Sequence, residues 1–140
     1  MSTPGKPARV LVVDDDAILA RVYGRALTAA GFEVDVARDG AEAFERILAE
    51  SYDVILSDLC MPRLDGLDLL KEARRRRPNV PVVIMTARLD SEVYALASEL
   101  GSVRCLSKPM TIQELTKAVE TAATIGAART RSNDRRPPQR

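Results

Sequence analysis

Five polar residues stand at the ends of short apolar runs in this 140-residue sequence, and their side chains have complementary chemistry. They are Asp14, Asp15, Asp58, Thr86 and Lys108. Carboxylates, a hydroxyl and an ammonium could together bind a cation and stabilise a transferring phosphoryl group. The chain contains no His, which excludes the commonest general base, the commonest metal ligand and Ser-His-Asp systems. Any chemistry must therefore use carboxylates, a Lys or a bound metal ion.

The three aspartates would repel one another in a small volume, and one would tend to take up a proton. A divalent cation resolves this conflict, and Mg²⁺ needs only one or two direct carboxylates because it keeps several waters. An ionised Asp58 could then attack phosphorus. Lys108 could pair with Asp58 and then with a phosphoryl oxygen, while the Thr86 hydroxyl donates to another. The residue types thus favour phosphoryl transfer to Asp58 with Mg²⁺, for which Mn²⁺ could substitute.

The spacing of apolar residues predicts the elements that bring these residues together. Short apolar runs predict strands at residues 9–13, 33–37, 53–57, 81–85 and 103–107. Helical periodicity, capping residues and stop signals predict helices at about 16–30, 39–50, 65–77, 90–100 and 111–124. Because the strands are mostly apolar rather than alternating, helices should cover both faces of a parallel sheet. The expected fold class is α/β, a doubly wound five-stranded parallel sheet flanked by five helices, with its site at the carboxyl ends of the strands.

Length and charge distribution predict one folded domain with a basic tail. Residues 1–125 carry 16 basic and 19 acidic groups, whereas residues 126–140 carry five Arg and one Asp. We expect a disordered N-terminus at 1–8, a domain at 9–124 and a basic disordered tail or linker remnant at 125–140. The apolar runs are too short to cross a membrane and no signal-peptide pattern is present, so the expected location is the cytoplasm. Cys60 and Cys105 are expected to be free thiols there.

Four motifs resemble those of the receiver domain of bacterial two-component response regulators, the CheY-like family. They are Val12-Val13-Asp14-Asp15-Asp16, Ser57-Asp58-x-x-Met61-Pro62-x-x-Asp65-Gly66, Met85-Thr86-Ala87 and Ser107-Lys108-Pro109. Each motif alone is weak, but all four in this order at the ends of expected strands are specific. The resemblance covers residues 9–124 and implies a flavodoxin-like sheet with strand order 2-1-3-4-5.

The resemblance also implies metal-binding and phosphoacceptor roles. Asp58 would accept a phosphoryl group from a phosphohistidine on a sensor histidine kinase or phosphotransfer protein. Asp15 would bind Mg²⁺ directly, Asp14 would hold a metal-bound water, and the backbone carbonyl of Cys60 would supply a further metal ligand. In this arrangement, a Mg²⁺ ion bound by these groups would form part of the phosphoacceptor site.

The remaining family roles concern the phosphoryl group and its readout. Thr86 would be the switch hydroxyl and Lys108 the lysine that contacts the phosphoryl group. Pro109 would follow Lys108 in a cis peptide bond. Ala87 and Arg88 would flank the phosphoryl group, where Arg88 could shield it from water.

Two positions depart from the family pattern. Cys105 stands where the family usually has a Tyr or Phe ring that moves inward with the switch Thr, and Met110 stands where a Phe is usual. A cysteine fills far less volume than a ring. The relay from phosphorylation to the output surface is therefore expected to be weaker, or to pass through the loop at residues 86–90.

The leading hypothesis is a phosphorylation-dependent response regulator rather than a conventional enzyme. It would catalyse only its own phosphorylation and slow autodephosphorylation, and it would change the face formed by the fourth helix, fifth strand and fifth helix. That face would bind a downstream effector protein or domain, while the first helix near Ile18 and Arg21 would contact the kinase. The sequence contains no DNA-binding domain, and we expect a monomer or a phosphorylation-dependent dimer without membrane contact.

Two alternatives remain. A degenerate receiver could act as a phosphorylation-independent binding module, a possibility that Cys105 leaves open. A phosphohydrolase of the haloacid-dehalogenase type would use Asp14 as its nucleophile, although Ile18 does not match the Thr or Val expected there. Asp16 is predicted to cap the first helix instead of binding a ligand.

Overall fold

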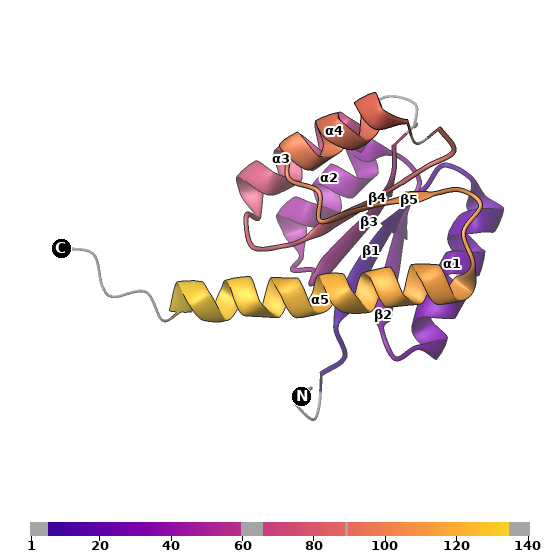
Figure 1. The fold of residues 1–140 in the computed structure, drawn as a ribbon. Coiled ribbons are helices and arrows are strands. Elements are labelled where there is room, and N and C mark those ends of the chain that lie inside the picture. The colour runs from indigo at the N-terminus through magenta and orange to yellow at the C-terminus, as the bar shows by residue number, and fades with distance from the viewer. Residues whose placement is uncertain (1–5, 60–65, 89, 135–140) are drawn as a thin grey trace.

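Five parallel strands alternate with five helices in the computed structural model, which describes residues 6–59, 66–88 and 90–134 (Figure 1). The strands are β1 (Arg9–Val13), β2 (Glu33–Ala37), β3 (Val54–Asp58), β4 (Val82–Thr86) and β5 (Arg104–Ser107). The helices are α1 (Ala17–Ala29), α2 (Gly40–Ala49), α3 (Gly66–Arg76), α4 (Ser91–Glu99) and α5 (Ile112–Asp134). The predicted alternation of strands and helices is therefore confirmed.

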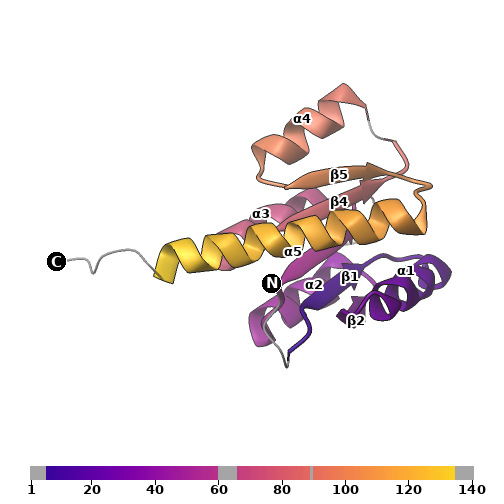
Figure 2. The same cartoon turned by 60° about the horizontal axis from the view of Figure 1, so that its bottom comes forward.

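The strands form a single sheet in the order β2-β1-β3-β4-β5, and every neighbouring pair is parallel. Helices α1 and α5 cover one face, and α2, α3 and α4 cover the other (Figures 1 and 2). Alternate residues of β1 point to opposite faces, so Val10 packs with Leu27 and Leu115 while Leu11 packs with Ile47 and Leu69. This confirms the doubly wound, flavodoxin-like fold and its 2-1-3-4-5 order.

Side-chain caps fix where the helices begin. Asp16 accepts hydrogen bonds from the backbone N–H groups of Ile18 and Leu19 at the start of α1, which confirms its predicted capping role. At the start of α5, Thr111 and Glu114 form the reciprocal capping box that the sequence predicts, with bonds of 3.0 and 2.9 Å. These caps fix how each helix starts next to the carboxyl ends of the strands, where the polar residues lie.

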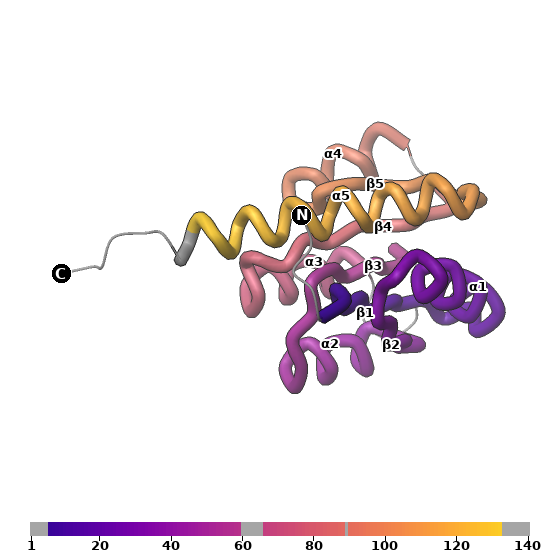
Figure 3. Tube along the Cα trace, turned by 90° about the horizontal axis from the view of Figure 1, so that it is seen from below, coloured from indigo at the N-terminus to yellow at the C-terminus, as the bar shows by residue number. Residues whose placement is uncertain are grey.

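The last helix differs from the sequence-based expectation. Helix α5 continues ten residues past Thr124 to Asp134 and extends beyond the rest of the domain (Figures 1 and 3). The expected end of this helix near residue 124 is therefore wrong. The first part of this segment is rich in Ala, a strong helix former, and the buried Gly126 lets the helix approach Pro81 closely. Residues 1–5 and 135–140 lie outside the described residues.

Two smaller differences concern strand ends and membrane contact. The third and fourth strands each run one residue further than expected, so that Asp58 and Thr86 are their last residues. Both polar side chains are consequently held by strand backbone rather than by a loop. None of the helices in the described ranges is both long and apolar enough to cross a membrane.

Candidate functional site

The carboxyl ends of strands β1, β3, β4 and β5 bring the predicted site residues together. Asp14 follows β1, Asp58 ends β3, Thr86 ends β4, and Lys108 follows β5. Asp14 is fully buried, Asp58 is 7% exposed and Thr86 is 1% exposed, whereas Asp15 is exposed to solvent. Strand β2 contributes no side chain to this group.

Lys108 joins the two buried carboxylates. Its Nζ donates a hydrogen bond of 2.9 Å to Asp14 Oδ2 and lies 3.3 Å from Asp58 Oδ2. Asp14 also accepts a 2.9 Å hydrogen bond from the backbone N–H of Asp16 through its other oxygen. The sequence suggested Asp58 as the partner of Lys108, but the closer contact is with Asp14. Lys108 thus holds both carboxylates at once.

The charges around Lys108 set its protonation. Burial alone would lower the pKa of Lys108, but the hydrogen bond and charge of Asp14 and the charge of Asp58 outweigh it, so its pKa is raised. Lys108 is therefore an ammonium throughout the neutral range. It neutralises one of three negative charges and leaves the pocket with an excess of negative charge.

Tyr23 of α1 is a further neighbour of the pocket. Burial raises the pKa of Tyr23, and the nearby charges of Asp14 and Asp58 act in the same direction while Lys108 opposes them. Its ring packs in the core between α1 and the sheet. No sequence motif marks this residue, because its position depends on the angle at which α1 leaves the pocket.

The three aspartates can hold a metal ion. One carboxylate oxygen from each of Asp14, Asp15 and Asp58 lies within 4.8 Å of the others. Such a cluster of hard oxygen donors, with one exposed member and two buried ones, suits Mg²⁺ or Mn²⁺ and the waters that Mg²⁺ retains. The donor set therefore fits the cation that the sequence predicts. The further predicted ligand, the carbonyl of Cys60, lies outside the described residues.

Thr86, at the end of β4, has a side-chain hydroxyl that accepts a backbone hydrogen bond. Thr86 Oγ1 accepts a 3.1 Å hydrogen bond from the N–H of Arg88, which leaves the hydroxyl proton available for donation. The carbonyl of Thr86 accepts from the N–H of Lys108 at 2.8 Å. Ala87 and Arg88 are both exposed at the rim. The peptide bond between Lys108 and Pro109 is cis.

Gly66, the last residue of the second motif, supports Asp58 directly. Its N–H donates to the carbonyl of Leu59 at 2.8 Å. A Cβ added at Gly66 would lie 2.5 Å from the carbonyl oxygen of Asp58 and 2.6 Å from Leu59 Cα. Only glycine lets the start of α3 approach the end of β3 this closely. The backbone of Asp58 is thereby fixed from behind.

Cys105 lies on β5 at the expected relay position, away from the acidic cluster. It is 9% exposed, and burial raises the pKa of its thiol. Beside it is a cavity of about 290 Å³ between α4 and β5, whose lining includes Tyr94 and Ser102. The space that a ring would fill is therefore open, in line with the small volume expected of a cysteine at this position.

The doubly wound sheet thus carries an acidic cluster and a lysine together at the carboxyl ends of its strands. Residues 10–120 match the family described as the response regulator receiver domain. This match covers most of the 140 residues, so the chain belongs to the receiver domain family of two-component response regulators.

Similar curated proteins are transcriptional regulators that are much longer than this chain. The DNA-binding transcriptional regulator NtrC of Escherichia coli K12 is 42% identical over 113 residues, which is 81% of this chain and 24% of that protein. A CpxR homolog of Haemophilus influenzae is 42% identical over 108 residues, which is 77% of this chain and 47% of that protein. The chain thus spans about a quarter to a half of the length of these relatives.

Solved structures share the fold. The receiver domain of Francisella response regulator 1452 superposes with a TM-score of 0.79 at 38% identity, covering 84% of this chain and 97% of that one. NtrX from Brucella abortus, solved in complex with ADP, gives a TM-score of 0.87 at 26% identity. That match covers 96% of this chain and 31% of NtrX. It therefore includes most of the long α5.

Proposed function

We propose that Asp58 accepts a phosphoryl group and that the domain works as a phosphorylation-dependent switch. The observation that carries this proposal is the double contact of Lys108 with Asp14 and Asp58 at 2.9 and 3.3 Å. An ammonium already shared by two carboxylates can turn toward a phosphoryl oxygen on Asp58 while keeping its bond to Asp14. The lysine then stabilises the product as well as the resting site.

The proposed reaction transfers the phosphoryl group from a phosphohistidine on a sensor histidine kinase or phosphotransfer protein. An oxygen of Asp58 forms a bond to phosphorus as the P–N bond breaks, and the electron pair of that bond leaves with the imidazole. Mg²⁺, when bound by Asp14, Asp15 and Asp58, supplies positive charge that offsets the repulsion between carboxylates and phosphoryl oxygens. The Thr86 hydroxyl donates its proton to a phosphoryl oxygen.

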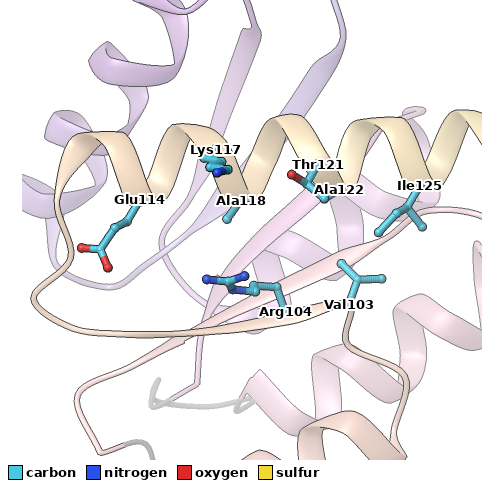
Figure 4. Close-up of a pocket in the computed structure, with 8 residues that line it drawn as sticks. All are labelled: Val103, Arg104, Glu114, Lys117, Ala118, Thr121, Ala122 and Ile125. Atoms are coloured by element: carbon cyan, nitrogen blue, oxygen red, sulfur yellow. The ribbon is translucent and has the colours of Figure 1, made fainter.

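The proposed output surface is formed by α4, β5 and α5. A cavity of about 260 Å³ lies between β5 and α5, lined by Arg104, Lys117, Ile125 and their neighbours (Figure 4). A downstream effector protein or domain would bind here, in a monomer or a phosphorylation-dependent dimer. Moving such a switch from roughly 1:99 to 99:1 requires about 5.5 kcal/mol of differential stabilisation. The small side chain of Cys105 favours a weaker shift.

The proposed kinase contact is on α1. Ile18 is 75% exposed at the first turn of this helix, close to Asp15 and Asp16 in sequence, and Arg21 is exposed one turn further on. An apolar side chain beside the mouth of an acidic pocket can pack against a partner that presents its phosphohistidine. A cytoplasmic location is part of this proposal, because sensor kinases present their phosphohistidine there.

Phosphate incorporation tests the proposal. The purified chain is incubated with Mg²⁺ and acetyl phosphate, a small phosphodonor, and acyl phosphate is detected by intact mass and by its lability at alkaline pH. The unmodified chain should gain one phosphoryl group, Asp58→Asn should gain none, and Asp68→Asn, a matched change of an exposed carboxylate on α3, should behave like the unmodified chain. Normal incorporation into Asp58→Asn would contradict the assignment.

A phosphate mimic then separates a switch from a binding module. With beryllium fluoride and Mg²⁺, a switch should show altered amide resonances in α4, β5 and α5. A degenerate receiver would bind its partner equally with and without the mimic. Turnover of a phosphate ester that survives Asp58→Asn would instead favour the phosphohydrolase hypothesis, in which Asp14 is the nucleophile. Both carboxylate oxygens of Asp14 accept hydrogen bonds, one from the N–H of Asp16 and one from Lys108, which weighs against that role.

A further inference from the structure

A groove between α1 and β2 lies outside the acidic pocket and outside the proposed output surface. It has a volume of about 480 Å³ and opens along the edge of the sheet. Its floor includes Gly24 of α1 and the half-buried Val34 and Val36 of β2. Arg21 and Arg25, both exposed, stand along its rim. The groove is thus an apolar channel bordered by two cations.

The main chain of β2 is available to a partner along this groove. Among the described strands, β2 pairs only with β1. The N–H of Glu33 and the carbonyl of Ala37 bond toward β1, to Ala8 and Asp14. Because the direction of main-chain groups alternates along a strand, Val34 and Val36 direct their N–H and C=O groups away from β1. Such an edge can accept an additional strand.

The charges around the groove select the kind of strand that fits. Arg21 and Arg25 are four residues apart on α1, so their side chains share one helix face. The acidic residues of β2 do not oppose them, because Glu33 and Asp35 lie on the other side of the strand and contact Arg9 at 3.6 and 2.9 Å. The charged residues that line the groove are therefore both basic, and they complement carboxylates.

Gly24 gives a second reason to regard the groove as a contact surface. Glycine is among the least favourable residues in the middle of a helix. A Cβ at Gly24 would meet Val34 Cγ1 at 3.7 Å and Val36 Cγ2 at 4.0 Å, which are ordinary van der Waals distances. Packing within the chain therefore does not require glycine here. Its absence of a side chain keeps the groove open above Val34 and Val36.

From these four observations we propose that the groove binds an extended, acidic segment of a partner protein. The segment adds to the sheet beside β2 through main-chain hydrogen bonds to Val34 and Val36. Because alternate residues of an added strand point to the same side of the sheet, its carboxylates lie on the α1 side and face Arg21 and Arg25. This contact is separate from Asp58, so it operates in the unphosphorylated protein.

Binding of a defined peptide tests this proposal. The probe is a fluorescein-labelled, end-capped peptide of alternating Val and Glu, titrated into the whole 140-residue chain. Its binding should shift the amide resonances of Gly24, Val34 and Val36. The double variant Arg21→Glu/Arg25→Glu should bind the probe about tenfold more weakly or worse and should bind the corresponding Val-Lys peptide instead. Gly24→Leu, which fills the groove, should also weaken binding.

Matched controls give the test its meaning. Lys71→Glu/Arg75→Glu makes the same charge change with the same spacing on exposed positions of α3, and it should leave probe binding within about twofold. Equal loss in this control, or resonance shifts elsewhere, would overturn the proposal. A single-stranded oligonucleotide that binds the groove more tightly than the peptide would replace it with a nucleic-acid site. A dimer of the unliganded chain that pairs two β2 edges would replace it with self-association.

Discussion

Lys108→Met is the substitution that most directly tests the electrostatics of the acidic pocket. The side chains are similar in length, but the ammonium that joins Asp14 and Asp58 is lost. In the native protein each of these contacts has a Coulomb energy of about 5–6 kcal/mol at an effective dielectric constant near 20. Desolvation of Lys108 offsets part of that energy. Removing one partner of a buried ion pair typically costs about 3–5 kcal/mol.

Protonation sets an upper limit to that loss. Once Lys108 is gone, one carboxyl can take up a proton and end the repulsion. At pH 7 this costs an aspartate about 4 kcal/mol, since each pH unit above its ordinary pKa of about 3.9 contributes 1.36 kcal/mol. At pH 5 the same proton costs about 1.5 kcal/mol. Lys108→Met should therefore lose about 3–4 kcal/mol of unfolding free energy at pH 7 and about 1.5 kcal/mol at pH 5.

The sign of this pH dependence follows from linkage. In the native protein the pKa of Lys108 is raised, so its stabilising contribution is complete below the ordinary Lys pKa of about 10.4 and is lost only as pH rises through the raised value. Lys108 therefore contributes equally at pH 5 and pH 7. In the variant, the folded state binds a proton that the unfolded state lacks, so its deficit grows as pH rises.

Urea denaturation at both pH values, in buffer with a chelator, measures the effect. Lys71→Met, at an exposed lysine of α3, is the matched control and should change the unfolding free energy by less than about 0.5 kcal/mol. A loss of less than about 1 kcal/mol at pH 7 in Lys108→Met, or a loss that is equal at the two pH values, would refute this account of the pocket.

Three further predictions concern other parts of the fold. In urea denaturation, Gly24→Ala should raise the unfolding free energy by about 0.5–1 kcal/mol. Gly126→Ala should instead lower it by about 1–3 kcal/mol, because its Cβ would lie 2.8 Å from Pro81 Cδ. Burial and the hydrogen bond to Asp35 raise the pKa of Tyr52 to about 12, so its neutral form stabilises the fold below the ordinary Tyr pKa of about 10, and this contribution is lost between that pH and 12. Tyr52→Phe should therefore remove the late phenolate transition that absorbance detects, and an unchanged absorbance titration would show this assignment to be wrong. Cys105→Tyr should lower the unfolding free energy, measured by thermal unfolding, by less than about 1 kcal/mol, because the adjacent cavity of about 290 Å³ can hold the ring. A decrease within the usual overpacking range of about 1–3 kcal/mol would mean that the cavity does not accept the ring.

Much of the fold could be predicted because its signals are local. Short apolar runs mark all five strands, and Asp16, Asp90 and the Thr111–Glu114 pair mark helix starts through side-chain bonds that span only three residues. The site could be located because parallel strands place their carboxyl ends at one edge. Neither inference needs knowledge of how the helices pack.

The features that the sequence did not predict depend on contacts between distant segments. Gly126 resembles a helix stop in sequence, yet in the fold it lets α5 pass close to Pro81 and the carbonyl of Asp53. The preference of Lys108 for Asp14 joins residues that are 94 positions apart. Gly66 and Tyr23 likewise gain their importance from the approach of α3 and α1 to the pocket. Composition and periodicity carry no information about such approaches.

The length of α5 has a mechanical consequence. A helix of 23 residues spans about 35 Å at 1.5 Å per residue. Its first turn begins a few residues after Lys108, while its last turns lie beyond the body of the domain (Figure 3). A tilt of about 10° at the first turn would displace the far end by about 6 Å, with no bending of the helix. If α5 moves as a rigid body, a small rearrangement beside the acidic pocket would become a displacement larger than a water molecule at the opposite end.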